Sequence, residues 1–384
     1  MEYGKRSIEL HEKIVGKLEI VSKAPVNNIE ELSLAYTPGV ADVCMEIYDK
    51  PERIYDLTSK GNTVAVVTDG SAVLGLGDIG AKASLPVMEG KAVLFKEFGN
   101  VDAFPVLIES KDIDTIVNTV KLIAGNYGGI NLEDISAPRC FEIEERLKKE
   151  LDIPVFHDDQ HGTAVVVLAG LINALKLKKL QFEDIKIVVN GSGAAGIAIT
   201  KLLLKVGVKD IVVCDSKGAI YEGKEGLNSY KKEIALITNR LMEKGSIHDV
   251  IKNKDVFIGV SKGNLLDGED IKAMNSESIV FAMANPIPEV DPAVAKSAGA
   301  LIVGTGRSDY PNQVNNVVAF PGIFRGALDV RAKEITEDMK IAAAYGIANS
   351  IDDEEICEDY ILPKPFDKKV LKNVSEAVKK AYVK

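Results

Sequence analysis

The sequence is poor in cysteine and contains no tryptophan. Its four cysteines lie far apart at Cys44, Cys140, Cys214 and Cys357, and no two of them form a C-x-x-C pair. This spacing excludes a disulfide scaffold and a zinc ribbon. We therefore expect the cysteines to be small buried apolar side chains in a reducing compartment.

Long apolar runs are missing as well. The longest run, Ala164–Ile172, is far shorter than the roughly 20 residues that a membrane-spanning helix needs. The N-terminus, MEYGKR, is charged and precedes no apolar signal-peptide segment. These absences predict a cytoplasmic protein that does not bind a membrane.

Positive charge is in deficit, because 47 Lys and Arg residues face 57 Asp and Glu residues and leave a net charge of −10. A chain this acidic has no electrostatic footprint for nucleic acid, and it attracts cations instead. Its hydrophobic fraction of 46% and charged fraction of 27% are those of a folded globular chain. At roughly 150 residues per domain, this length predicts two or three domains.

Short β-branched runs alternate with longer helical patterns, which is typical of α/β architecture. The segment Thr163–Leu175 is apolar on all sides, which predicts a buried helix that connects two domains. Before it, we expect Ser136 to cap a helix that has Pro138 in its first turn. The elements expected in this first part are strands at 63–68, 92–95, 103–108 and 153–156, and helices at 112–124 and 138–151.

A regular series of strands separated by helical segments follows, and it predicts a doubly wound parallel sheet of the Rossmann type. We place the domain boundary near residue 160. The first domain then covers residues 1–160, and the Rossmann-type domain covers residues 161–384, with a helical tail from Arg331. The strands expected in the second domain are 185–189, 211–215, 256–260, 279–284 and 301–304.

A glycine-rich turn opens this second domain. It has the pattern G-x-G-x-x-G, directly follows the strand IKIVV and begins a helix expected at 194–206. This context is the one that dinucleotide binding requires, because the pyrophosphate lies on the free N–H groups of the helix N-terminus. The predicted cofactor-binding residues are Gly191, Ser192, Gly193, Ala194, Ala195 and Gly196.

The choice of dinucleotide depends on Asp215, which ends the next strand 19 residues after Gly196. Its carboxylate can accept hydrogen bonds from the adenosine ribose and would repel a 2′-phosphate, so it favours NAD. Ser216 and Lys217 follow and could accommodate a phosphate, which leaves NADP open.

A second G-x-G-x-x-G match lies at Gly75–Gly80. We expect no regular helix after it, because Pro86 interrupts the pattern. A turn that brings backbone close to a ligand is the better interpretation. The sequence thus predicts one Rossmann site.

Two pairs of carboxylates end two strands of the first domain. Glu133 and Asp134 follow the run GINL, and Asp158 and Asp159 follow VFH. The carboxyl ends of parallel strands form the ligand-binding edge of an α/β sheet. Either pair alone could be a helix cap or a solvated turn, but together they favour a cation with oxygen ligands, such as Mg²⁺ or Mn²⁺.

Two histidines, His157 and His161, flank the second acidic pair. Zinc proteases carry the motif H-E-x-x-H on a helix, whereas this segment reads H-D-D-Q-H-G across a strand end. We expect ordinary hydrogen-bonding histidines.

At this point the sequence resembles the malic enzyme family in its short prokaryotic form. The resemblance runs in order along nearly the whole chain and includes the Rossmann fingerprint. The other matching segments are Tyr36–Ala41, Gly75–Gly80 with Pro86–Lys91, Gly129–Ile135, Phe156–Ala164, Ala284–Pro286 and Asn315–Gly322.

The resemblance implies oxidative decarboxylation of (S)-malate to pyruvate and CO2, with reduction of NAD or NADP, by a homodimer that depends on Mg²⁺ or Mn²⁺. It implies that Lys91 is the general base and Tyr36 the general acid. Asn285 and Asn316 line the substrate and nicotinamide site. The implied metal ligands are Glu133, Asp134 and Asp159, with Asp158 pairing with or orienting Lys91.

One departure from the family concerns the substrate. Larger eukaryotic members carry an arginine shortly before the glycine-rich loop, where this sequence has Gly70–Val73 and then Leu74. The second carboxylate of the substrate must then be bound by other groups, and backbone amides of Gly75–Gly77 and the two asparagines are the candidates. Two other functions stay open: a metal-independent amino-acid dehydrogenase, and a nucleotide-sensing protein without catalysis.

Overall fold

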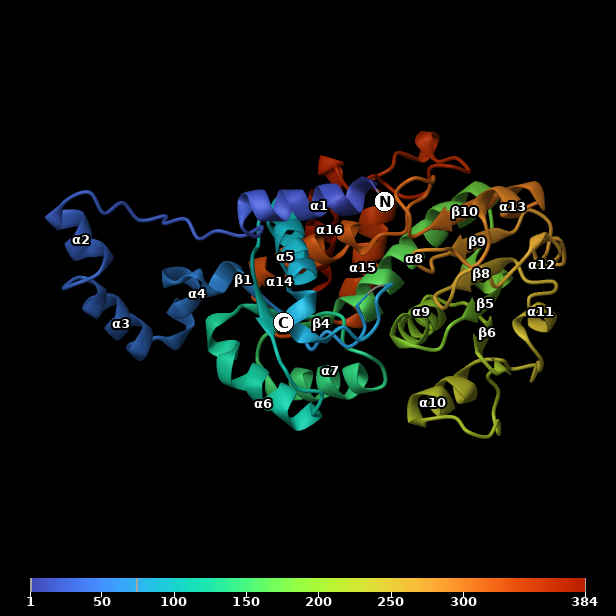
Figure 1. Cartoon of the computed structure of the whole chain (residues 1–384), viewed down its shortest axis with the longest axis horizontal. Coiled ribbons are helices and arrows are strands. Elements are labelled where there is room, and N and C mark those ends of the chain that lie inside the picture. Colours follow the sequence, from blue (N-terminus) through green and yellow to red (C-terminus); the bar gives the residue numbers. More distant parts are fainter. Residues whose placement is uncertain (1, 74, 384) are drawn as a thin grey trace.

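The chain forms two parallel sheets joined by a long buried helix (Figure 1). The computed structural model describes residues 2–73 and 75–383. The first sheet has the strand order β2-β1-β3-β4, and all of its neighbouring strands are parallel. Its strands are β1 (Thr63–Thr68), β2 (Asp102–Leu107), β3 (Gly129–Leu132) and β4 (Val155–His157).

The second sheet has the order β10-β9-β8-β5-β6-β7. Five strands are parallel, and only the short edge strand β7 pairs antiparallel. The chain reverses its direction of winding between β5 and β8, which is where doubly wound sheets bind ligands. The predicted α/β class with a Rossmann-type sheet is confirmed. The strands are β5 (Lys186–Asn190), β6 (Asp210–Asp215), β7 (Gly218–Ala219), β8 (Val256–Gly259), β9 (Ile279–Ala282) and β10 (Ile302–Thr305).

The strand predicted at residues 92–95 is wrong. Those residues lie in the last turns of helix α5 (Gly80–Gly99), which also contains Pro86. A short apolar run has no periodicity of its own and fits a buried helix as well as a strand. The helix also follows Gly75–Gly80 directly, although we expected none there. Burial of its inner face outweighs the hydrogen bond that Pro86 removes; that face comprises Ala81, Ser84, Met88, Lys91, Ala92 and Phe95.

Two helix starts also differ from prediction. Helix α7 (Arg139–Glu150) has Pro138 rather than Ser136 at its N-cap position, and no side chain caps it. Helix α8 (Asp158–Lys178) begins at the acidic pair itself, five residues before the predicted start at Thr163. The sequence did not predict this start because the first turn of α8 is polar and the apolar pattern begins only after it.

Helix α8 connects the two sheets and is buried almost throughout its length. Among the described residues it is the one helix long and apolar enough to cross a membrane, and 78% of its most apolar stretch is buried inside the protein. A helix that is apolar on all sides needs such surroundings. Its buried amide Asn173 donates hydrogen bonds to the carbonyl oxygens of Ala348 and Ile361.

The C-terminal helices fold back against the first sheet. Phe320 and Phe324 of α14 (Phe320–Asp329) pack against Phe95 of α5, with ring centroids 4.6 and 5.2 Å away. This packing fixes α5, and with it Lys91, against the sheet edge. The other helices of the two halves are α6 (Ile113–Ile123), α9 (Ala194–Lys205), α10 (Ser229–Ile237), α11 (Ile247–Val250), α12 (Gly268–Lys272), α13 (Pro292–Ser297), α15 (Glu337–Ala348) and α16 (Lys368–Ala381).

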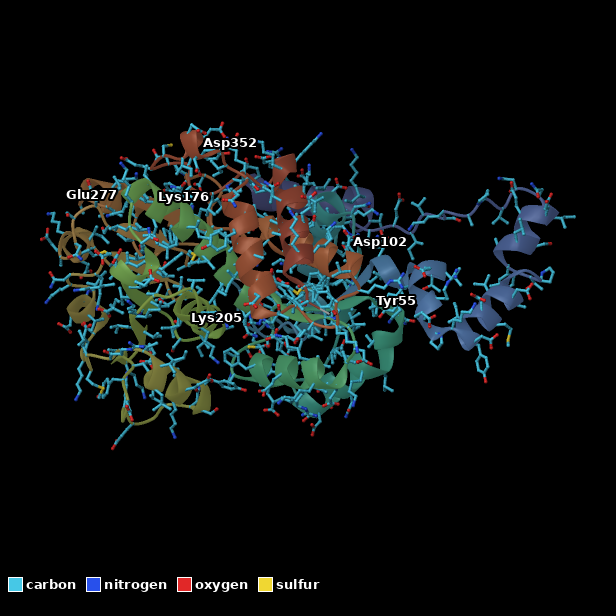
Figure 2. The ribbon with its side chains drawn as sticks, turned by 180° about the vertical axis from the view of Figure 1, so that it is seen from behind. Tyr55, Asp102, Lys176, Lys205, Glu277 and Asp352 are labelled. Atoms are coloured by element: carbon cyan, nitrogen blue, oxygen red, sulfur yellow. The ribbon has the colours of Figure 1, made fainter. Side chains whose placement is uncertain are left out.

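The first 60 residues lie largely outside this body. Helices α2 (Ile29–Ala35) and α3 (Val40–Asp49) project away from it, and α4 (Ile54–Leu57) brings the chain back to β1 (Figures 1 and 2). Helix α1 (Glu2–Ile14) lies against the body near α5 (Figure 1). The first buried hydrophobic side chain of the described chain is Val64 in β1. The prediction that the cysteines are buried holds for Cys140 and Cys214 but is wrong for Cys44, which lies on the projecting helix α3, and for Cys357, which is also exposed.

Candidate active site

Four carboxylates meet at the carboxyl edge of the first sheet. Strands β3 and β4 pair with Leu132 opposite His157, so the residues that follow each strand are neighbours. Oxygen atoms of Glu133, Asp134 and Asp159 all lie within 4.8 Å of one another. The structure therefore brings together the three residues that the sequence indicated as metal ligands.

The cluster is arranged to receive a cation. Asp134 is buried, and its φ of +54° is a backbone conformation that residues other than glycine rarely adopt. Its Oδ2 has no hydrogen-bond partner among the described residues. Burial, and then the charges of Asp159 and Glu133, raise the pKa of Asp134 to about 9. Burial also raises the pKa of Glu133. Carboxylates held this close repel one another unless a cation joins them, and their hard oxygen atoms suit Mg²⁺ or Mn²⁺.

Lys91 reaches this edge from the buried face of α5. Its Nζ lies 2.6 Å from Asp158 Oδ2 and 2.9 Å from Glu133 Oε1, and 4.2 Å from the ring centroid of Phe320. Burial opposes the charged form of the ammonium group, but the two carboxylates outweigh it and raise the pKa of Lys91 well above its usual value. A lysine this deeply buried and paired is not a surface lysine.

Asp158 is held in place from two sides. It is fully buried, and its Oδ2 accepts a hydrogen bond from the Nδ2 of Asn316 as well as from Lys91. Asn316 begins a short 3₁₀ turn after the second sheet, so this bond links the two halves of the chain. One helical turn later, Gly162 leaves the space that the Asp158 carboxylate fills.

Replacing Gly162 with alanine is expected to lower kcat by about 10²-fold, since a displacement near 1 Å at a reacting group has that effect. An added Cβ would collide with Asp158 Oδ1 and would lie 3.0 Å from Asn316 Cβ. Steady-state kinetics checks this, with Gly90→Ala in α5 as the matched control because a Cβ there meets only the end of Lys17. Equal activity of the two variants would show that Asp158 needs no such placement.

The two histidines differ in their surroundings. His161 Nε2 lies 2.9 Å from Glu144 Oε1, and its Nδ1 faces Lys340 Nζ at 3.1 Å. Burial, with a contribution from Lys340, lowers the pKa of His161 to about 4. His157 is fully buried, and its ring nitrogens have no hydrogen-bond partner among the described residues. His161 therefore supports the fold as expected, whereas the hydrogen bonds expected for His157 are not formed.

A cavity of about 520 Å³ lies between the two sheets, beside the carboxylate cluster. Asp159 and Ser136 line it from the first half. From the second half it is lined by Gly193–Ala195 of the glycine-rich turn Gly191–Gly196, here called the fingerprint turn. Asn285 and Asn316 face the same cavity. The structure thus places the predicted metal ligand Asp159, both asparagines and the predicted cofactor turn around one space.

The glycines of the fingerprint have the roles that their spacing predicts. Gly191 has a φ of +125°, and Gly196 packs so closely on the Gly191 carbonyl that no side chain would fit. Gly193 caps α9 with open space in front of it, where a pyrophosphate can approach the backbone. Ser192, Ala194 and Ala195 complete the turn and the first residues of the helix.

Asp215 ends β6 as predicted, and two lysines bind its carboxylate. Lys231 Nζ lies 2.8 Å from Oδ2, and Lys224 Nζ lies 3.2 Å from Oδ1. The Lys217 backbone N–H donates to Oδ1 as well. Burial acts to raise the pKa of Asp215, but these hydrogen bonds lower it overall. The lysines partly cancel the charge that would repel a 2′-phosphate.

Sequence reasoning missed Glu289. This fully buried carboxylate accepts hydrogen bonds from the backbone N–H groups of Ser261 and Ala284, each at 3.0 Å. It thereby ties together the loops after β8 and β9, which carry Ser261 and Asn285 into the cavity. The sequence places Glu289 in a polar Pro-rich loop, where nothing distinguishes it from a solvated side chain.

Arg139 was also missed. Its Nη1 lies 2.7 Å from Asp69 Oδ2 at the end of β1, and its Nη2 donates to Ser71 and Ser136. It orients the hydroxyl of Ser136, which lines the cavity. The pairing of β1 with β3 brings these residues together, and no local pattern shows it.

Tyr36 is not brought to this site. It follows α2 on the projecting segment, is 68% exposed, and its hydroxyl makes no hydrogen bond within the described chain. Figure 1 shows α2 well separated from β4 and α5. The predicted general acid and the predicted general base therefore lie apart within one chain.

Two family models of known proteins match this chain, one in each half. Residues 15–148 match the family model "Malic enzyme, N-terminal domain", and residues 160–384 match "Malic enzyme, NAD binding domain".

Close relatives cover almost the whole chain. The "Bifunctional malic/malolactic enzyme" of Bacillus subtilis is 59% identical over 99% of this chain and 93% of its own length. The "NAD-dependent malic enzyme" of Geobacillus stearothermophilus is 59% identical over 96% of this chain and 77% of its own. The crystal structure of the NAD-dependent malic enzyme of Thermotoga maritima superposes with a TM-score of 0.94 at 51% identity, covering 97% and 98% of the two chains.

Proposed function

The chain belongs to the malic enzyme family, and we propose on this premise that it catalyses the oxidative decarboxylation of (S)-malate to pyruvate and CO2. The observation that carries the proposal is the buried cluster of Lys91 with Glu133 and Asp158 at the edge of a cavity that the dinucleotide fingerprint also lines. Neither feature alone requires this reaction. Together they support a reaction in which a proton acceptor, acidic oxygen ligands and a hydride acceptor act on one small substrate.

Glu133, Asp134 and Asp159 would hold Mg²⁺ or Mn²⁺, since their converging oxygens include one without any partner. When bound, such an ion polarises the C2 oxygen of malate and stabilises the negative charge that develops there. Every other step falls to side chains of the protein.

Lys91 removes the C2 hydroxyl proton as the hydride passes to the nicotinamide. In its resting ion pairs it is protonated, so it must give up a proton before each turnover. Asp158 and Glu133 orient it, and Asp158 is itself fixed by Asn316. After CO2 leaves, C3 of the enol takes a proton from the phenol of Tyr36.

The second substrate carboxylate has no dedicated arginine before the glycine-rich loop. We assign it to Asn285, Asn316 and the backbone of Gly75, which line the same cavity. The ordered hydroxyl of Ser136 adds a further donor there.

The alternatives are tested by substrate and by metal removal. We expect malate with NAD and Mn²⁺ to yield NADH and pyruvate in equal amounts, and amino acids to give no turnover. Full activity in the presence of EDTA would favour a metal-independent dehydrogenase. The absence of NADH with either cofactor would favour a nucleotide-sensing protein.

NAD is the proposed cofactor because Asp215 ends β6 and lines a cavity with Gly191 and Ser192, where its carboxylate could accept the ribose hydroxyls, and because its hydrogen bonds lower its pKa. Asp215→Ala should shift the ratio of kcat/KM for NAD over NADP by about 10- to 100-fold towards NADP. A hydrogen bond to a charged group contributes about 1.5–3 kcal/mol, and Lys224 and Lys231 would then face the 2′-phosphate. The measurement is kcat/KM for each cofactor at saturating malate.

The matched control is Asp210→Ala, at the opposite end of the same strand. Asp210 pairs with Lys254 and is remote from the fingerprint turn, so its replacement should leave the cofactor ratio unchanged. A ratio that stays constant in both variants would remove Asp215 from cofactor selection.

Three broader assignments complete the proposal. The substrate and metal domain is residues 1–160, and the cofactor domain is residues 161–384. The enzyme acts in the cytoplasm on a small-molecule substrate, without nucleic acid or membrane partners. It acts as a homodimer.

A further inference from the structure

The N-terminal arm, residues 18–53, exposes many apolar side chains, as a segment does that packs against another protein surface. Ten of the 29 exposed large hydrophobic side chains of the described residues lie on this arm, between Leu18 and Tyr48. Helices α2 and α3 contain no buried residue. Figure 2 shows their side chains surrounded by open space, beyond Tyr55 and Asp102 on the body where the arm departs.

The exposed side chains include Ile29 at 84%, Leu34 at 70% and Tyr48 at 78%. On α3, Val40, Val43 and Ile47 share one helix face, and none of them is buried. Folded monomers rarely expose contiguous apolar surface of this kind, and where they do it marks an interaction site. The arm contributes nothing to the core of its own chain.

The active site, in turn, lacks a group that the arm carries. No tyrosine, histidine, cysteine or lysine is among the described residues that line the cavity beside Asp159. Lys91, the proposed base, lies beside the carboxylates at its edge, and the proposed reaction needs a separate acid to protonate C3. The phenol assigned to that step, Tyr36, lies on the arm and is 68% exposed.

We infer that two copies of the chain exchange their arms, so that Tyr36 of the partner subunit completes each active site. The inference rests on the proposed roles of Tyr36 and Lys91. In a two-fold dimer each arm contacts the other subunit in the same way, and exchange of an identical element is a common route to such dimers. The site is shared, and a single chain holds only half of its acid–base pair.

The entrance to the cavity offers a surface for the arm. Leu76 is 65% exposed beside Gly75, and Ile287 is 48% exposed close to Asn285. The two loops adjoin, because a Cβ on Gly75 would lie 3.9 Å from Pro286. An apolar helix that covers these side chains also excludes water from the reacting enol.

The chemistry of the shared step is a tautomerisation. The phenol of Tyr36 gives its proton to C3 of enolpyruvate, and the electrons of the C2–C3 double bond form the new C–H bond. Lys91, protonated in the oxidation step, has by then given that proton to the enolate oxygen that decarboxylation leaves, so the enol hydroxyl can return it to Lys91, which leaves the ketone of pyruvate. Solvent then returns a proton to the phenolate.

Complementation between two inactive variants tests the inference. Tyr36→Phe and Lys91→Ala chains that carry different affinity tags are co-expressed, and the mixed dimer is purified on both tags. Each parent dimer should be at least about 10²-fold less active than wild type. The mixed dimer should recover about half of the wild-type activity, because one of its two sites then holds both intact residues.

Three results would overturn the inference. A mixed dimer no more active than its parents would place Tyr36 and Lys91 of one chain in one site. Failure to isolate any mixed dimer would show that the chains do not associate. Activity retained in either parent would refute the proposed roles themselves, which separates that failure from failure of the sharing.

A second variant tests the arm without touching the proposed acid or base. Leu34→Asp places a charge on an exposed position of the single chain, so the chain should still fold. It should dissociate on dilution and lose activity, and both should recover at high protein concentration. Leu122→Asp, at an 86% exposed position of α6, is the control. A fully active Leu34→Asp monomer would contradict arm exchange.

Discussion

Lys91→Ala should reduce kcat for malate oxidation by about 10²- to 10⁴-fold, the range that a positioned general base supplies. The variant should still bind NAD, because the fingerprint turn and Asp215 lie on the other sheet. Lys91 is 8% exposed and contacts both Asp158 and Glu133, so no other described lysine can take its place. Steady-state kinetics and NAD titration by fluorescence measure the two effects separately.

Removal of Lys91 also takes the ammonium partner from two buried carboxylates, and breaking a buried pair in this way costs about 3–5 kcal/mol of stability. The melting temperature must therefore be measured alongside the kinetics. Lys82→Ala on the same helix is the control, because Lys82 is 83% exposed and pairs only with Glu109. Turnover close to wild type in folded Lys91→Ala protein would remove Lys91 from the reaction.

Asp159→Ala should raise the Mn²⁺ concentration for half-maximal activity by at least about 100-fold. The substitution removes one of three converging ligands, whereas loss of a mere supporting hydrogen bond near a metal already costs 10- to 100-fold in affinity. Wild-type protein should also melt at a higher temperature with Mn²⁺, since a ligand that binds only the folded state stabilises it. The variant should lose most of that increase.

The control for Asp159 is Asp152→Ala. Asp152 is exposed and precedes the same strand β4 that Asp159 follows, so the two substitutions remove one charge each from opposite ends. Only Asp159→Ala should change the metal titration. Identical Mn²⁺ curves for the wild type and both variants would discredit the assignment of the ligands.

The sequence predicted those parts of the site that depend on local rules. The fingerprint is a continuous turn between a strand and a helix. The two carboxylate pairs directly follow apolar strands, so the pairing of these strands in a parallel sheet brings the carboxylates together. Five strands of the second sheet were found for the same reason. Each is a β-branched run bounded by turn residues.

What the sequence could not show depends on contacts between distant segments. Arg139 and Glu289 act through residues that the sheets bring near, and neither lies in a pattern of its own. Lys91 was indicated only by the family resemblance, because its helix was partly mistaken for a strand. Tyr36 was also assigned its role by the family resemblance alone, and the separation of α2, which it follows, from α5, which carries Lys91, became visible only in the fold (Figure 1).

The most direct test of the account is kcat/KM for malate, measured with NAD and with NADP, each with and without Mn²⁺. We predict turnover only when the metal is present, pyruvate as the product, and a higher value with NAD than with NADP. Malate oxidation that proceeds equally well after metal removal, or no reduction of either cofactor, would contradict the central claim that the strand-end carboxylates and Lys91 form a malate-oxidising site.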